Sequence, residues 1–427
     1  MRAHFSLSRL SRVVPLIVLG ALLATLAGLG AGAVLRPGDL AGSAPYSLLA
    51  GFLLAIGLYG STHEIDLDAL RRDVRGVLVA VTLGVVVKAS LIAGVMLLAF
   101  QDARYLVLGI AVAQIDPLSV AAMRASSRMS ARAKALLFAW ASFDDPITVL
   151  LSLYFSILAF RLAGREGSPR TGPAGEGAGA YLSDLGSNLA LVAAAALVFV
   201  ALRALRRARP GPEAPAAGDG SPARPRGGRL ADLVSLAVLP VVLLAAAEWT
   251  LMLAVALIGL FLRVGAYAKV LDRAVAAAFL AASFALGLLL VDGVDLVPAL
   301  VLGVAAFGAQ AIVSLVVVPV LKQGLSRRDR VHLALGQQNG ITAIILALAL
   351  EPDFRGTVGI VAPAILVVNV LHYASNGLLN RLAGDPVPPP AGEPGPPAEA
   401  PLPGTPDPGP SSQAGVCAPA QGTAPEN

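Results

Sequence analysis

Runs of about 20 mostly apolar residues recur along almost the whole chain, and they constrain its fold more than any other feature. A helix needs about 20 such residues to cross the hydrocarbon core of a bilayer. Our candidate spans are residues 13–35, 43–60, 76–100, 104–123, 133–160, 181–203, 230–247, 249–264, 273–291, 295–320, 331–350 and 357–380. The sequence therefore predicts an all-α polytopic membrane protein with about twelve transmembrane helices.

The small number of charged residues supports a membrane protein. They make up 14% of the 427 residues, whereas a soluble globular chain carries roughly 25%. The one cysteine, Cys417, lies in the tail, and the four histidines show no metal-ligand spacing. The sequence shows no nucleotide-binding motif, and we predict no cofactor and no enzymatic activity.

The basic residues between the spans give an orientation rather than a nucleic-acid surface. Lys and Arg concentrate in the cytoplasmic loops of membrane proteins. If the N-terminus lies in the cytoplasm, most of the 32 Lys and Arg residues fall in cytoplasmic loops. We therefore expect a multi-pass protein of the cell membrane with both termini cytoplasmic. We interpret the first apolar run as a retained helix rather than a signal peptide.

Two segments rich in Pro, Gly and Ala lie outside the predicted spans. Residues 208–229 separate the two halves of the chain, and residues 383–427 form its tail. Neither segment has enough apolar residues to form a packed core. We predict that both are disordered and cytoplasmic, and that residues 1–382 form the transmembrane domain.

The fourth span is interrupted by a carboxylate at membrane depth. It contains Gln114-Ile115-Asp116-Pro117, in which proline removes a backbone donor. Opened backbone is tolerated there only against protein or a water-filled cavity. The pattern predicts a broken helix with Asp116 at the break, although a simple proline kink with Asp116 hydrogen-bonded to a neighbour also fits.

The fifth span contains two adjacent acids, in Ser142-Phe143-Asp144-Asp145-Pro146. Consecutive residues of a helix point about 100° apart, so the two acids can border one cavity without sharing a face. A buried carboxylate beside another can hold a proton at neutral pH and release it when a cation arrives. The pattern favours ion exchange over the alternative, in which the pair caps a half-helix after Pro146.

The eleventh span is interrupted by Gly336-Gln337-Gln338-Asn339-Gly340-Ile341-Thr342. Broken helices in corresponding positions of two halves indicate the midplane site of a transporter. The fourth and eleventh spans are each the middle of a triplet, so we predict inverted repeats whose breaks cross near Asp144 and Asp145. Lys88, deep in the third span, either pairs with Asp144 or Asp116 or extends to the membrane interface.

In order and spacing, these motifs resemble those of the monovalent cation:proton antiporter superfamily, which includes the bacterial sodium/proton exchangers. Asp116-Pro117-Leu118-Ser119 is similar to its Thr-Asp-Pro motif in an unwound helix. Asp144-Asp145, followed by Pro146-Ile147-Thr148, is similar to its ion-binding motif on the next helix. The resemblance covers residues 13–382.

The resemblance implies an antiporter that exchanges Na+, or else K+ or Li+, for H+ by alternating access. It also implies a homodimer in membrane lipid. In each copy, core helices would move against scaffold helices. The core would comprise residues 76–160 and 295–382, and the scaffold residues 13–60 and 230–291.

The resemblance also implies roles for individual residues. Asp145 would be the main cation and proton site, with Asp144 as its partner. Asp116 would contribute to binding of the transported cation and compensate the helix ends at the crossing. The residues expected to support this site are Ser142, Thr148, Gln338, Asn339, Lys88 and Gln310.

The chain departs from the superfamily at several positions. Ile115 stands where threonine is usual, Trp140 where exchangers of the Asn-Asp type carry glutamate, and Gln310 where the tenth helix usually has Arg or Lys. Lys88 is our candidate substitute for that missing cation. The alternative function is a sodium-coupled symporter of an organic anion, whose site would need a fixed cation.

Overall fold

The computed structural model describes residues 7–35, 40–63, 65, 74–116, 120, 129–170, 177–208, 226–261, 268–320 and 325–382. Residues Met1–Leu379 form one compact unit, to which all statements below apply, and Asn380–Asn427 separate from it. The predicted tail and most of the predicted linker lie outside the described residues. The linker boundaries are corrected, because residues 208 and 226–229 belong to helices.

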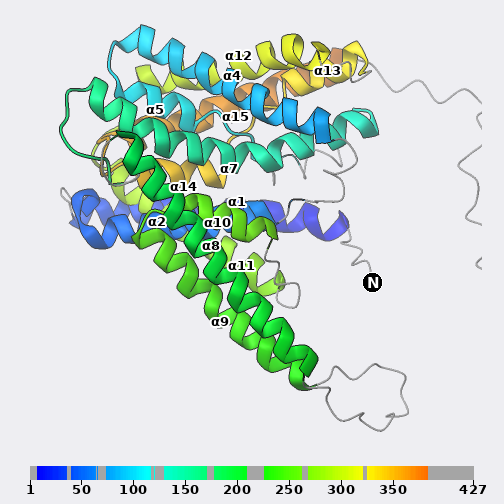
Figure 1. The fold of residues 1–427 in the computed structure, drawn as a ribbon. Helices are drawn as coiled ribbons and strands as arrows, with labels where there is room; N and C mark the ends of the chain where they lie inside the picture. Colours follow the sequence, from blue (N-terminus) through cyan, green and yellow to red (C-terminus); the bar gives the residue numbers. More distant parts are fainter. Residues whose placement is uncertain are drawn as a thin grey trace, which may run out of the picture. The chain divides into compact units, whose positions relative to one another are not determined.

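The described residues form thirteen α-helices and one short 3-10 helix, with no strand among them (Figure 1). In chain order they are α1 (Leu7–Leu35), η1 (Leu40–Gly42), α2 (Ala44–His63), α4 (Val74–Phe100), α5 (Arg104–Ala111), α7 (Ala131–Leu162), α8 (Gly177–Ala208), α9 (Arg226–Glu248), α10 (Met252–Phe261), α11 (Ala268–Leu290), α12 (Leu296–Val320), α13 (Arg327–Ala334), α14 (Ile341–Leu350) and α15 (Thr357–Leu382). The predicted all-α polytopic membrane fold is confirmed.

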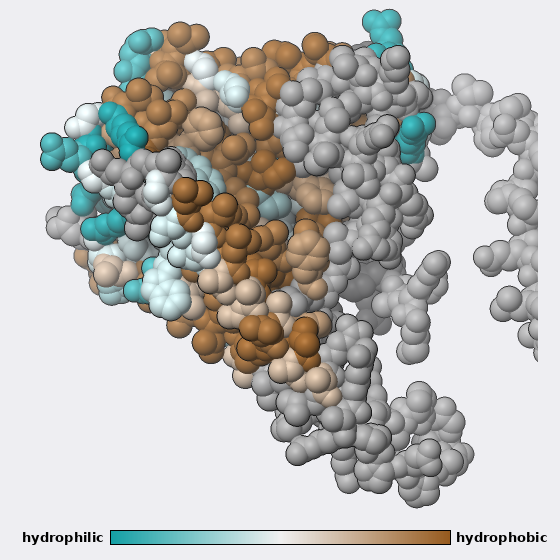
Figure 2. Space-filling view, viewed as in Figure 1, coloured by the Kyte–Doolittle hydropathy of each residue, from teal (hydrophilic) through white to brown (hydrophobic). Residues whose placement is uncertain are grey.

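Every predicted span coincides with a helix, and in the fourth and eleventh spans the helix ends part-way through the span. Within the described ranges, six helices are long and apolar enough by themselves to cross a membrane. Those stretches are Ala44–His63, Arg132–Leu162, Leu182–Ala201, Val270–Leu290, Leu296–Val316 and Thr357–Leu379. Figure 2 shows apolar side chains over much of the described face, with hydrophilic ones gathered where the α7–α8 loop lies.

The helices pack in two groups. α4, α5, α7, α12 and α13 contact mainly one another, and buried residues of α14 and α15 join the apolar cluster between α4, α5 and α12. α1, α2, α8, α9, α10 and α11 form the other group. α2 meets α7 and α14 where the groups adjoin, and α11 also meets α14.

Glycines bring α1 and α11 into close contact within the second group. A Cβ at Gly28 would overlap the carbonyl oxygen of Phe284, and one at Gly287 would overlap that of Thr25. Small residues let helix backbones approach in lipid, where van der Waals packing rather than the hydrophobic effect drives association. The α1–α11 pair is therefore fixed by backbone-to-backbone packing.

Two helices are broken at mid-span, as the sequence predicts. α5 ends at Ala111 and residues 112–116 leave the helix, while residues 335–340 separate α13 from α14. Pro117 lies outside the described residues. α7, in contrast, continues through Pro146, so the alternative of a half-helix capped by the two acids is wrong.

Asp329 joins the first turns of α7 and α13. Its carboxylate accepts hydrogen bonds from the backbone N–H and hydroxyl of Ser130 (2.8 and 3.0 Å) and from the hydroxyl of Ser326 (2.9 Å). Ser130 and Ser326 are themselves the N-caps of the two helices. One carboxylate therefore sets the spacing between the helix that carries the acids and the helix that leads into the second break.

Candidate ion-binding site

Side chains of the second break bind the backbone exposed by the first. The amide nitrogen of Gln337 donates to the carbonyl of Gln114 (2.8 Å). The amide nitrogen of Asn339 donates to the carbonyls of Val112 (2.9 Å) and Gln114 (3.0 Å). Carbonyls at a helix C-terminus have no partner within the helix and need one elsewhere. The polar run in the eleventh span therefore caps α5, and the predicted crossing of the breaks is confirmed.

Asp116 lies at this crossing, opposite the N-terminus of α14. Its backbone N–H donates to the carbonyl of Gln338 (2.9 Å). A Cβ at Gly340, the N-cap of α14, would stand 2.6 Å from Oδ2 of Asp116. A helix N-terminus carries partial positive charge, which stabilises a carboxylate. The expected broken helix is confirmed here, and the simple proline kink is wrong.

Asp144 forms a buried ion pair with Lys88. The Lys88 Nζ lies 2.6 Å from Oδ2 of Asp144, and both side chains have no exposed surface. The backbone N–H of Ile115 donates to the same oxygen at 2.9 Å. Trp140, one turn before Asp144, places its ring centre 5.6 Å from Nζ, and Thr148, one turn after, is buried. Of the alternatives for Lys88, pairing with Asp144 is therefore the observed one.

Asp145 points to the other side, toward α14. Its Oδ2 accepts a hydrogen bond from the Thr342 hydroxyl (2.8 Å), while its Oδ1 has no hydrogen-bond partner among the described residues. The residue is 2% exposed, and it is close enough to Asp116 and Asp144 for their charges to interact. The two adjacent acids thus border one region from different faces of α7. Asp144 is neutralised by a lysine, and Asp145 keeps an oxygen available.

The remaining predicted residues divide into two sets. Gln338 is buried beside the acids, and its Oε1 has no partner in the described part of the chain. The Ser142 hydroxyl donates to the carbonyl of Phe138 (2.8 Å), within its own helix. Gln310 donates to the carbonyl of Leu333 (3.2 Å), so it caps α13 instead of taking the position of a cation at the carboxylates.

These residues lie within the region that comparison with known families identifies. The family described as "Sodium/hydrogen exchanger, transmembrane" matches residues 1–208, which include Lys88, Asp116, Asp144 and Asp145. By this match, the first half of the chain is similar to the sodium/hydrogen exchanger family. Comparison with curated proteins gives no match. Among solved structures, the sodium proton antiporter MjNhaP1 from Methanocaldococcus jannaschii at pH 8 is similar. It shares 15% identity over 87% of this chain and 98% of its own, with a TM-score of 0.49.

Several residues at this site were not among the predicted site residues. Gln337 and Thr342 belong to the predicted break and contribute hydrogen bonds at the crossing, and Asn369 and Asn376 of α15 also bind the break. With His372, the two asparagines are spaced i, i+3 and i+7, which places the three α15 residues on one face of a membrane span. Polar residues on one face of a span indicate a functional contact, so this face could be read from the sequence, although its partners could not.

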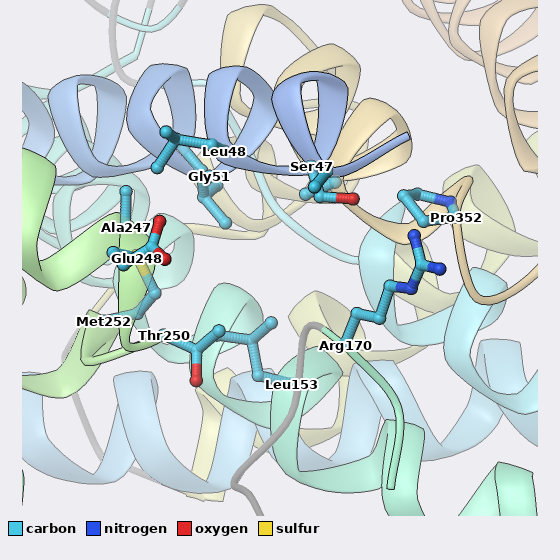
Figure 3. A pocket seen from close by; sticks show the side chains of 13 residues that line it. Ser47, Leu48, Gly51, Leu153, Arg170, Ala247, Glu248, Thr250, Met252 and Pro352 are labelled. Atoms are coloured by element: carbon cyan, nitrogen blue, oxygen red, sulfur yellow. The ribbon is translucent and has the colours of Figure 1, made fainter. Parts of the chain in front are cut away.

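The protein also has a cavity beside the helices that carry the acids. A cavity of about 270 Å³ lies between α2, the α9–α10 turn, α7 and α14 (Figure 3). Its walls include Leu153 and Ala349, each about two helical turns beyond Asp145 and Thr342 respectively. Val149, one turn beyond Asp145, belongs to the same buried apolar cluster as Leu153. Apolar side chains therefore lie along α7 between the acid and the cavity.

The α7–α8 loop spans this end of the interface. The Arg170 guanidinium donates to the carbonyl of Gly42 (2.6 Å), and its backbone N–H donates to the carboxylate of Asp353 (2.9 Å). Arg165 donates to the carbonyl of Asp353 (2.6 Å). The loop therefore connects the α14–α15 turn in one helix group with the start of α2 in the other.

No resident metal site accompanies the acids. Across the residues for which the structure gives positions, no group of three His, Cys, Asp or Glu side chains is arranged to hold a metal ion.

Proposed function

We propose that this protein is a secondary antiporter that exchanges a monovalent cation, with Na+ as the first candidate, for H+ at Asp145. The observation that carries the proposal is the state of this carboxylate. It is buried, one of its oxygens has no hydrogen-bond partner among the described groups, and its neighbour Asp144 is already neutralised by Lys88. Such an acid can take either a proton or a cation.

The surrounding oxygens suit an alkali cation. Hard cations prefer oxygen ligands. Asp145 Oδ1 and the Thr342 hydroxyl offer two, and the carboxylate of Asp116 and the buried Gln338 lie at the same crossing. A proton on Asp145 and a cation beside it would both remove the same charge, so they compete. The core would move past the scaffold at low cost only with a proton or a cation bound at Asp145, because an uncompensated buried charge is expensive. Movement of the cation in one direction would therefore be coupled to movement of H+ in the other.

Lys88 supplies a fixed positive charge. It stands on α4, whereas the resemblance places the corresponding Arg or Lys on the tenth span, where Gln310 lies. We propose that Lys88 substitutes for that residue and keeps Asp144 charged while Asp145 titrates. Replacing Lys88 with Ala should then lower transport or shift its pH profile, and an unchanged profile would count against the role.

Alternating access would move one helix group against the other. We propose that α4, α5, α7 and α12–α15 form the moving core, and that the other group is the scaffold through which two copies associate in the cell membrane, with both termini cytoplasmic. The cavity beside Leu153 lies between the groups and would widen when the site opens toward this end. The Arg170 contact with Gly42 would have to break in that step.

Proteoliposomes with an internal pH-sensitive dye test the proposal. After a pH gradient is imposed, Na+, K+ and Li+ are added in turn, and at least one should collapse it. Asp145→Asn should abolish the response, whereas Asp102→Asn, at a partly exposed acid on the α4–α5 connection, should leave it intact. If none of the cations collapses the pH gradient and Na+ drives uptake of an organic anion, the symporter is favoured instead.

A further inference from the structure

The ends of the second break obtain their hydrogen bonds from outside the crossing. The carbonyls freed by the first break are bound by Gln337 and Asn339 of the second, and the N–H of Asp116 binds the carbonyl of Gln338. The second break also frees backbone groups at its two ends, and an unpaired buried backbone group is costly. Partners for these ends come from a third helix, α15.

Two asparagines of α15 bind the ends of the second break. The Asn376 amide nitrogen donates to the carbonyl of Leu335 (2.9 Å), where α13 ends. Asn369 makes a reciprocal pair with the backbone of Asn339, accepting from its N–H (3.3 Å) and donating to its carbonyl (3.2 Å). The break is therefore held at both of its ends.

His372 lies between these asparagines, near the backbone of Leu335 and Gln337. Its Nδ1 lies 3.4 Å from the Asn376 amide nitrogen, the same group that binds the carbonyl of Leu335. The residue is 3% exposed. A buried ring with two polar nitrogens needs partners, and here the polar groups around it are Asn376 and the opened backbone.

We propose that Asn369, His372 and Asn376, the α15 clamp, hold the second break in the form that creates the ion site, and that His372 is a positioning residue for cation selectivity. The break ends at Gly340, against Asp116. One residue later α14 begins, and its Thr342 binds Asp145. Alkali cations differ mainly in radius, so small displacements of these oxygens change which ion fits best.

This inference rests on the proposed antiport, and its first test uses the same dye assay. Apparent KM values for Li+, Na+ and K+ are compared in the wild type, His372→Leu and His372→Gln. The leucine variant keeps bulk without a hydrogen-bonding group, and the glutamine variant restores one. Val370→Leu, at an exposed position of the same helix, is the control. We expect the leucine variant to change the ratio of KM values by about fivefold, the effect of one lost hydrogen bond, and glutamine to restore it.

A purely structural role gives a different result. Fewer folded molecules would lower the maximal rate for every cation equally and leave the ratio of KM values unchanged, which would overturn the proposal. Hydrogen–deuterium exchange on purified protein separates the clamp from the transport proposal. If His372→Leu or Asn376→Ala accelerates amide exchange in residues 335–340 above the control, the clamp stands even where no cation drives H+ movement. Unchanged exchange in both variants overturns it.

Discussion

The ion pair of Lys88 and Asp144 makes a quantitative prediction. Neither side chain is exposed, and Nζ lies 2.6 Å from Oδ2. Lys88→Met preserves most of the side-chain volume beside Trp140 but leaves a buried carboxylate whose Oδ2 retains only the N–H of Ile115. Removing one partner of a buried pair costs about 3–5 kcal/mol, because the other charge is left uncompensated. We expect Lys88→Met to lower the free energy of unfolding by about that amount.

A double-mutant cycle isolates the interaction. Replacing a buried ion pair by apolar residues of similar volume is often neutral or stabilising. Lys88→Met combined with Asp144→Leu should therefore recover most of the loss, with a coupling free energy of about 3 kcal/mol or more. Denaturant unfolding in detergent micelles, followed by tryptophan fluorescence, measures all four corners of the cycle. Additive effects, with a coupling below about 1 kcal/mol as for exposed pairs, would refute the buried ion pair.

Three further substitutions test the contacts around the site. Thr342→Val removes the hydrogen bond to Asp145, and the apparent KM for Na+ in proteoliposomes should rise about tenfold, with Thr342→Ser near wild type. Gly340→Ala drives a Cβ into the carboxylate of Asp116, so exchange should be lost while gel filtration stays normal; full activity would contradict this contact. Burial raises the pKa of Asp329, but hydrogen bonds from two serines outweigh it and lower the pKa overall. The ionised Asp329 carboxylate therefore stabilises the folded protein at pH values above its ordinary pKa, and this stabilisation is lost as the pH falls through the lowered pKa. The melting temperatures of wild type and Asp329→Asn should differ at neutral pH and converge once the pH falls below the lowered pKa of Asp329, and a constant difference would contradict this.

The positions of the helices follow from the sequence, since apolar runs long enough to cross lipid leave little choice of structure. Hydropathy predicts only the part of each helix that lies inside the bilayer, and not where the helix begins and ends outside it. α9 therefore begins at Arg226, before the predicted 230, and α8 reaches Ala208. Both breaks were also predictable, because polar residues and Gly or Pro at membrane depth require opened backbone with partners.

Which side chains meet could not be read from the chain. The sequence shows that Lys88 lies deep in its span. Whether it pairs with Asp144 or with Asp116 depends on how α4 is rotated about its axis, which the sequence does not show. Gln310 was expected near the acids, yet it caps α13, because the carbonyl of Leu333 becomes exposed only once α13 ends there. The α15 residues were missed for the same reason, since their partners exist only after the break has formed.

The central claim is that a cation and a proton compete for Asp145. It is tested most directly by proton release, without a membrane gradient. Purified protein in detergent, at weak buffering and with a pH indicator, is titrated with NaCl. Wild type and Asp102→Asn should release protons as Na+ binds, and choline chloride should release none. The account predicts no release from Asp145→Asn, and release equal to that of the wild type would contradict it.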